Sequence, residues 1–245
     1  LRVLGDFDFT RQQLVSQSDK FATYLDENLL WVKSADPVDV SFIKGVLLSL
    51  QWLISPVIGL TLVNDEFNLG LQKPILIIIG LVGLMLMLLA KKWAKQQLIA
   101  LSVKIQRLYS DSFIDTLQAL AYTLILVLPI PLFSYYLGWI LSNDIHVVAF
   151  TRAIGKGLQS ASVSLLFLQF FYRLFAEEGV ARKHFHWQKN TLSLLHKQIA
   201  WLRFVAVLTT FIMASTAASQ VALYNDTLGR LAFIISMAAI ACFLG

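Results

Sequence analysis

The feature that most constrains this chain is a series of long apolar stretches without a charged side chain. A helix needs about 20 mostly apolar residues to cross the hydrocarbon core of a bilayer. Backbone N–H and C=O groups cannot be left unpaired in lipid, so each stretch is predicted to be helical. A sixth stretch begins after Arg230, and the first five lie from Lys44 to Asp65, Lys73 to Lys91, Asp115 to Asp144, Lys156 to Arg173 and Arg203 to Asp226.

The composition favours a membrane protein over a soluble enzyme. Hydrophobic residues make up 57% of the 245 residues and charged residues 14%, with a mean hydropathy of +0.68. Soluble domains carry nearer a quarter of charged residues, at about 25%. The net charge of +5 comes from basic residues beside the apolar stretches, which suits lipid headgroups and not nucleic acid. We therefore predict an all-α, polytopic transmembrane domain of five to six membrane segments.

Residues 1–42 differ from the rest of the chain and are predicted to be aqueous. Leu14, Phe21, Leu25 and Asn28 keep a helical spacing, which predicts a short helix that ends before Pro37. We divide the chain into a periplasmic linker helix region, 1–42, and a transmembrane domain, 43–245, cut at its C-terminus. The linker holds four bases and seven acids, which are Asp6, Asp8, Asp19, Asp26, Glu27, Asp36 and Asp39.

Lysine and arginine in the connectors predict the orientation in the membrane, because cytoplasmic loops carry an excess of both. The determinants are Lys91, Lys92 and Lys95 after the second stretch, and Arg182 and Lys183 after the fourth. We place both connectors in the cytoplasm. Their leucines and isoleucines recur every three or four residues, which predicts helical hairpins with cytoplasmic helical extensions. These residues are Leu98, Leu101, Ile105 and Leu108, then Leu192, Leu195, Ile199 and Leu202.

The first apolar segment, 43–63, conflicts with this orientation. If residues 1–42 lie outside, a complete crossing would put the next stretch on the wrong side. Gln51 and Ser55-Pro56 interrupt the segment, and a proline breaks or kinks a helix. We interpret it as a bent, interfacial or half-inserted element. A full crossing that places residues 1–42 in the cytoplasm is the alternative.

Tryptophans and prolines are the candidate functional side chains. Amphipathic rings favour the headgroup level of the membrane, so we predict that the tryptophans lie at the membrane interfaces. They either transmit bilayer tension as levers or, in the favoured interpretation, only anchor the helices. Pro56, Pro129 and Pro131 are predicted helix kinks, with a static role favoured over a hinge. The predicted anchors are Trp31, Trp52, Trp93, Trp139, Trp187 and Trp201.

Patterns that carry enzyme or cofactor chemistry are missing from the sequence. No acidic or basic residue lies at the centre of an apolar stretch, which argues against an ion-coupled transporter. His184 and His186 have no cysteine or carboxylate at a zinc spacing nearby. Gly155-Lys156-Gly157 lacks the remaining residues of a phosphate loop. We predict no cofactor, no metal and no enzymatic activity.

Three short stretches carry a resemblance to a known family. They are residues 21–34 (FATYLDENLLWVKS), the pair Asp36-Pro37, and residues 50–56 (LQWLISP). The chain resembles the entry to the inner-membrane domain of large MscS-type mechanosensitive channels, the MscK/MscM branch. This resemblance implies a bacterial inner-membrane location and a peripheral place in a homo-oligomer, a heptamer. Its partners would be lipids, neighbouring subunits and its own pore domain, which is missing from these residues.

The leading functional hypothesis follows from that resemblance. We expect a peripheral domain that senses membrane tension in a channel releasing ions and osmolytes on hypo-osmotic shock. The membrane domain of a transporter or exporter is the alternative, and it would require a midplane site of broken helices. The membrane anchor of a sensor or of a lipid-processing enzyme is the third hypothesis.

Overall fold

The computed structural model describes Gln17 and residues 39–54, 74–108, 113–143, 148–176, 179–183 and 187–244. The chain divides into two compact units, Leu1–Val38 and Asp39–Gly245, and every element discussed here belongs to the second. All secondary structure in the described ranges is helical, which confirms the all-α prediction. The predictions for Trp31, Pro56, His184 and His186 fall outside the described residues.

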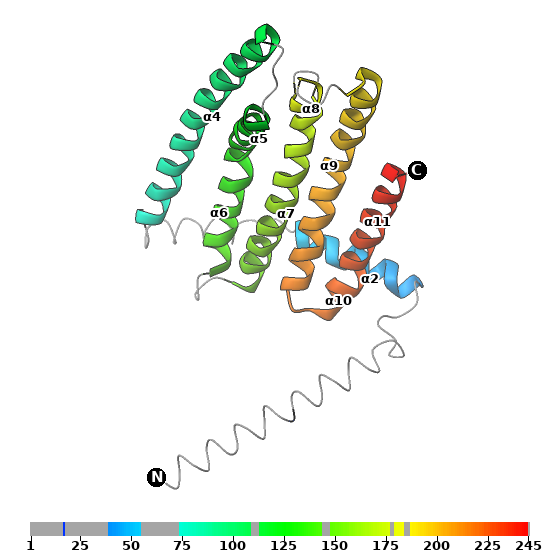
Figure 1. Ribbon diagram of the computed structural model, residues 1–245. Coiled ribbons are helices and arrows are strands. Elements are labelled where there is room, and N and C mark those ends of the chain that lie inside the picture. Colours follow the sequence, from blue (N-terminus) through cyan, green and yellow to red (C-terminus); the bar gives the residue numbers. More distant parts are fainter. Residues whose placement is uncertain are drawn as a thin grey trace. The chain divides into compact units, whose positions relative to one another are not determined.

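The long helices of the second unit lie side by side (Figure 1). Helix α7 contacts α6 and α9, α9 contacts α11, and α4 contacts α5 and α6. Short helices α8 (Val180–Lys183) and α10 (Ala222–Tyr224) and a π-helix, η1 (Asn225–Gly229), join them. The long helices are α4 (Pro74–Leu108), α5 (Phe113–Val127), α6 (Pro129–Asn143), α7 (Ala149–Leu174), α9 (Lys189–Ala218) and α11 (Arg230–Leu244).

Three helices in the described ranges are long and apolar enough to cross a membrane. The number of candidate spans rises to four if one bent pair of helices is counted as a single span. The three are Ile75–Ala100, Lys189–Ala218 and Ala222–Leu244. The bent pair is α5 and α6, and the direction of the helix changes by 49° at the break around Leu128. Pro129 and Pro131 follow the break directly, and a proline cannot donate the backbone hydrogen bond of a regular helix. The bend therefore has a local cause.

Helix α7 fails the same test of apolarity, although it is 26 residues long. Small residues join it to its neighbours. A methyl group at Gly138 of α6 would lie 2.6 Å from the carbonyl oxygen of Gly155, and one at Gly157 would overlap the hydroxyl of Ser215 in α9. Small residues let membrane helices approach closely. Helices α6, α7 and α9 thus form the tightly packed part of the unit.

The fifth apolar stretch, 203–226, was predicted as one span, and the structure differs. Helix α9 ends at Ala218, and the chain turns through Gln220, whose φ of 59° lies in the left-handed region. The next helix begins at Ala222, so Arg230 lies within the final helical segment and not before it. Uncharged residues make this turn, which is why a boundary drawn at charges missed it.

The first described helix is α2 (Val40–Ile54), with 15 residues. At about 1.5 Å per residue it is roughly 22 Å long, less than the roughly 30 Å of a hydrocarbon core. Asp39 caps its start, because its carboxylate accepts from the Ser41 hydroxyl at 2.5 Å and from the Phe42 N–H at 3.0 Å. Figure 1 shows α2 running crosswise near the ends of α9 and α11.

Candidate functional site

Helix α4 is the least buried of the three candidate spans in the described part of the chain. None of the residues in its apolar 18-residue window is buried, against 28% for the windows in the other two candidate spans. Within this window its side chains are exposed or half-buried, which suits a helix beside acyl chains, whereas further along Leu98 packs against Ala119 and Val180. Large exposed residues along it include Ile75, Ile78, Leu81, Met85, Leu86 and Leu89.

One contact holds α4 near its first turns, and we call Leu76, Gly80 and Tyr136 the Tyr136 clamp. The Tyr136 hydroxyl donates to the Leu76 carbonyl oxygen at 2.6 Å. The ring lies so close to Gly80 that an added methyl group would be 2.6 Å from Cε1. Gly83, one turn along, has nothing within 4 Å of the same added atom. The absence of a side chain at Gly80 thus lets the ring of Tyr136 cover the helix backbone.

A second contact holds α4 further along, and we call Trp93, Ala94 and Tyr122 the Tyr122 clamp. The rings of Trp93 and Tyr122 meet edge to face with centroids 5.5 Å apart. Ala94 is fully buried, although its neighbours on α4 are exposed. Aromatic pairs of this kind contribute about 0.5–1.5 kcal/mol beyond the area they bury. These two contacts, together with the packing of Leu98 against Ala119 and Val180, attach α4 to its neighbours.

Helix α2 docks through a face of small and polar residues. The hydroxyls of Ser49 and Thr227 lie 2.9 Å apart, and each also lies within hydrogen-bond distance of a carbonyl of its own helix. Each hydroxyl has one proton, so whichever donates across the interface gives up its bond within the helix. Trp52 stacks on Tyr224 at 4.7 Å and meets Phe150 edge-on at 5.0 Å. The large apolar residues of α2 face outward, including Ile43, Leu47, Leu48 and Ile54.

Among the charged residues that the structure describes, Arg203 of α9 lies nearest the middle of a candidate span. Its guanidinium donates to the side-chain oxygen of Gln169 in α7 and lies over the ring of Tyr172 at 4.4 Å. His196 stacks on the same ring with centroids 4.0 Å apart. Gln169 and Tyr172 thus give the Arg203 guanidinium partners between α7 and α9. The described residues hold no group of three or more side chains that could bind a metal ion. The arrangement is a structural contact between α7 and α9.

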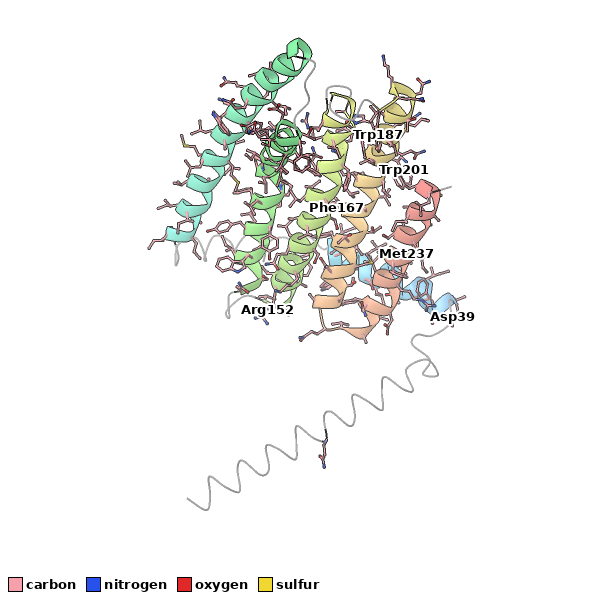
Figure 2. All side chains as sticks on the ribbon, in the orientation of Figure 1. Asp39, Arg152, Phe167, Trp187, Trp201 and Met237 are labelled. Carbon is pink, nitrogen blue, oxygen red and sulfur yellow. The ribbon has the colours of Figure 1, made fainter. Side chains whose placement is uncertain are left out.

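The tryptophans predicted as anchors take different positions. Trp93, Trp139 and Trp187 are exposed, and Figure 2 shows Trp187 at the end of the bundle opposite Arg152. Trp201 is half-buried, and its N–H donates to Gln198 at 2.5 Å. Trp52 is also half-buried, in the contact between α2 and Tyr224. Its surroundings are those of a packing residue.

The predicted topology determinants lie together at one end of the bundle. Lys91 and Lys95 of α4 line a cavity with Arg173 of α7 and with Gly179, which follows α7, so these basic residues of α4 and α7 adjoin. Lys92 is exposed beside them. Arg182 and Lys183 fall in α8. Pro129 and Pro131 are buried where α5 meets α6.

Sequence reasoning missed the residues that make the contacts. Gly80 and Ser49 are small residues inside apolar stretches, Thr227 lies between the fifth and sixth stretches, and Tyr136 lies in the third. A glycine in a membrane helix signals a close approach, but the sequence does not say which of Gly80 and Gly83 makes it. A partner about 60 positions away lies beyond any local pattern.

Comparisons with known proteins agree with this architecture. The family model described as mechanosensitive ion channel inner membrane domain 1 matches residues 74–245, from the first residue of α4 onward. The mechanosensitive channel MscK of Escherichia coli strain K12 is 25% identical over 250 residues, which cover 96% of this chain and 21% of that protein. The chain thus spans about a fifth of the length of that relative. No solved structure gives a significant match.

Proposed function

The chain belongs to the mechanosensitive ion channel inner membrane domain 1 family, and we propose that it is a peripheral, tension-sensing part of such a channel. The complete channel would release ions and osmolytes when hypo-osmotic shock stretches the membrane. The observation that supports this role is the exposure of α4, whose apolar window contains no buried residue. A helix surrounded by lipid responds directly to changes in the bilayer.

Tension can shift a population only if two states occupy the bilayer differently. We infer that α4 is clamped in one state and tilted or displaced in the other. The Tyr136 clamp and the Tyr122 clamp together are worth on the order of 1–3 kcal/mol, from one hydrogen bond and one aromatic pair. Moving a two-state equilibrium from 1:99 to 99:1 takes about 5.5 kcal/mol. The clamps are therefore weak enough for membrane tension to open and strong enough to hold α4 at rest.

The proposed orientation places the basic end of the bundle in the cytoplasm. Lys91 of α4 and Arg173 of α7 line one cavity at that end, α8 with Arg182 follows there, and segments rich in lysine and arginine stay inside. The opposite end, where α2 docks near Phe150 and Tyr224, then lies at the periplasmic face of a bacterial inner membrane. Residues 1–42 would precede it in the periplasm.

Five crossing segments fit this orientation, with α2 as a sixth that lies at the interface. They are α4, the bent pair α5–α6, α7, α9, and α10 through α11. Helix α7 is less apolar, but 26 residues reach about 39 Å, and its small-residue faces are covered by α6 and α9. The domain would assemble with its pore domain and with neighbouring subunits in a homo-oligomer, a heptamer by family resemblance.

A transporter or exporter domain is the less favoured function. It would place ionisable groups at a broken helix near the midplane. The break at Leu128 is followed by buried prolines, and Arg203 is engaged by Gln169 and Tyr172. The family is a channel family and not an enzyme class.

Patch recording of the full-length protein that carries this chain tests the proposal. Reconstituted in liposomes, the protein should give currents gated by suction below the lytic pressure. Tyr136→Phe removes the hydroxyl that bonds to Leu76, so it should lower the pressure of half-maximal opening. Tyr135→Phe is the matched control, since Tyr135 is the exposed neighbouring tyrosine. Silence up to lysis would refute the proposed function, and equal shifts in both variants would refute the role of the clamp.

A further inference from the structure

A cavity of about 380 Å³ lies between α4, α5, the end of α7 and the turn before α8. Its lining brings together cations from two helices far apart in the sequence, Lys91 and Lys95 of α4 and Arg173 of α7. Apolar side chains complete the wall, among them Leu98 and Leu126. The proposed function uses these residues only to orient the domain in the membrane.

The charge of the cavity calls for an anion. No carboxylate occurs among the described lining residues, and Thr123 already donates its proton to the Ala119 carbonyl at 2.7 Å. Like charges gathered at one site repel each other, and a bound anion removes that cost. Lysine and arginine are the side chains that bind phosphate, with charge-assisted hydrogen bonds to its oxygens.

The depth of the cavity indicates which anion fits. Lys91 follows Pro74 by 17 residues on one continuous helix, which is about 26 Å at 1.5 Å per residue. A helix that enters the hydrocarbon core near Pro74 therefore reaches the opposite headgroup layer near Lys91, since the core is about 30 Å thick. The α4 surface between these two residues is exposed and apolar, as acyl chains require.

We propose that the cavity is a binding site for the phosphate of an anionic glycerophospholipid, held by Lys91, Lys95 and Arg173. The lipid would bridge α4 to α7 at the headgroup level, while its acyl chains lie along α4. This inference rests on the membrane orientation in the proposed function, and it does not depend on gating by tension. Bound lipid would add to the attachment that the Tyr122 clamp gives.

The sequence contains its own candidate anions, Glu177 and Glu178, next to Gly179. Both lie outside the described residues, so the experiment has to separate them from a lipid. Glu177→Gln combined with Glu178→Gln should leave lipid affinity within about twofold of wild type if the cations bind lipid phosphate. A rise of more than about fivefold would mean that the glutamates occupy the cations, and it would overturn the proposal.

The test is native mass spectrometry of the detergent-solubilised full-length protein. Phosphatidylglycerol is titrated against phosphatidylcholine with the same acyl chains, and inorganic phosphate is titrated separately. Phosphatidylglycerol should be preferred, and Lys91→Gln and Arg173→Gln should each weaken it about fivefold, from roughly 1 kcal/mol per surface charge. Lys92→Gln is the matched control, because Lys92 is exposed and its side chain is not part of the lining.

Each remaining outcome separates the explanations. Equal losses in the Lys92 and Lys91 variants would indicate diffuse attraction to the surface and overturn the site. Inorganic phosphate that binds alone and displaces the lipid would indicate a soluble anion as the ligand. Lipid binding as predicted in a protein without pressure-gated currents would support this site and refute the proposed function.

Discussion

Replacing Gly80 with alanine is expected to loosen the attachment of α4, whereas the same replacement at Gly83 is not. A methyl group at Gly80 would lie 2.6 Å from Cε1 and 3.1 Å from Cδ1 of Tyr136, and carbon atoms prefer about 3.5–4.0 Å. The ring must therefore move by about 1 Å. It is held by the hydroxyl bond to Leu76 and packs against Trp139 with centroids 6.1 Å apart, so the movement strains both contacts.

The magnitude follows from terms that differ between the two glycines. Overpacking costs about 1–3 kcal/mol, and a weakened hydrogen bond adds up to about 1 kcal/mol. The gain from replacing glycine with alanine in a helix, about 0.5–1 kcal/mol, is common to both variants and cancels. Gly83→Ala has nothing within 4 Å to strain. The variants should differ by roughly 2–3 kcal/mol, or about 30- to 150-fold in the ratio of clamped to released α4.

Distance measurement between spin labels reports this ratio. Leu86 on α4 and Phe204 on α9 are exposed, so both accept labels, and Cys242 is first replaced with serine. Gly80→Ala should add a second population of α4–α9 distances in the full-length protein in nanodiscs. Gly83→Ala should reproduce the wild-type distribution. Indistinguishable distributions for the two variants would refute the Tyr136 clamp.

Three further predictions concern the other contacts. Gly45→Ala places a methyl group 2.5 Å from Cγ2 of Thr227, so hydrogen exchange across α2 should quicken about tenfold or more, and unchanged exchange would contradict its docking. The Ser41 hydroxyl and then the Phe42 N–H hold the pKa of Asp39 below its usual 3.8; the cap therefore stabilises α2 above that pH and is lost only as pH falls through the lowered value. The measurement is the protection of the first turn of α2 against hydrogen exchange, relative to the intrinsic exchange rate at each pH. Protection that is already lost when the pH is lowered to about 6 would contradict this role of Asp39. Gln220→Gly should relieve about 1 kcal/mol of left-handed strain and raise the thermal midpoint, and a lowered midpoint would show that the Gln220 side chain matters more.

The sequence predicted the helical class and the family correctly because both depend on local patterns. Apolar stretches without charge mark membrane helices, and the uncharged residues 74–90 and 116–143 fall within α4 and the pair α5–α6. The family expected from the motifs in residues 21–56 is confirmed by the family match over 74–245 and by the relative that aligns with 96% of the chain. The helix break beside Pro129 likewise has a local cause.

The contacts that hold the helices could not be predicted in the same way. Gly80 and Gly83 have similar apolar neighbours in sequence, but only Gly80 meets Tyr136, because the rotation of α4 against α6 decides which one is covered. The turn at Gln220 was missed for a different reason. It lies inside an uncharged stretch, where hydropathy does not distinguish two helix ends from one continuous helix.

The most direct test of tension sensing by α4 is the distance between Leu86 and Phe204 with and without membrane tension. Lysophosphatidylcholine added to one leaflet of liposomes that contain the full-length protein supplies the tension. The distance distribution is expected to shift toward the released population seen with Gly80→Ala as the channel opens. A channel that opens while this distance distribution stays unchanged would contradict the account.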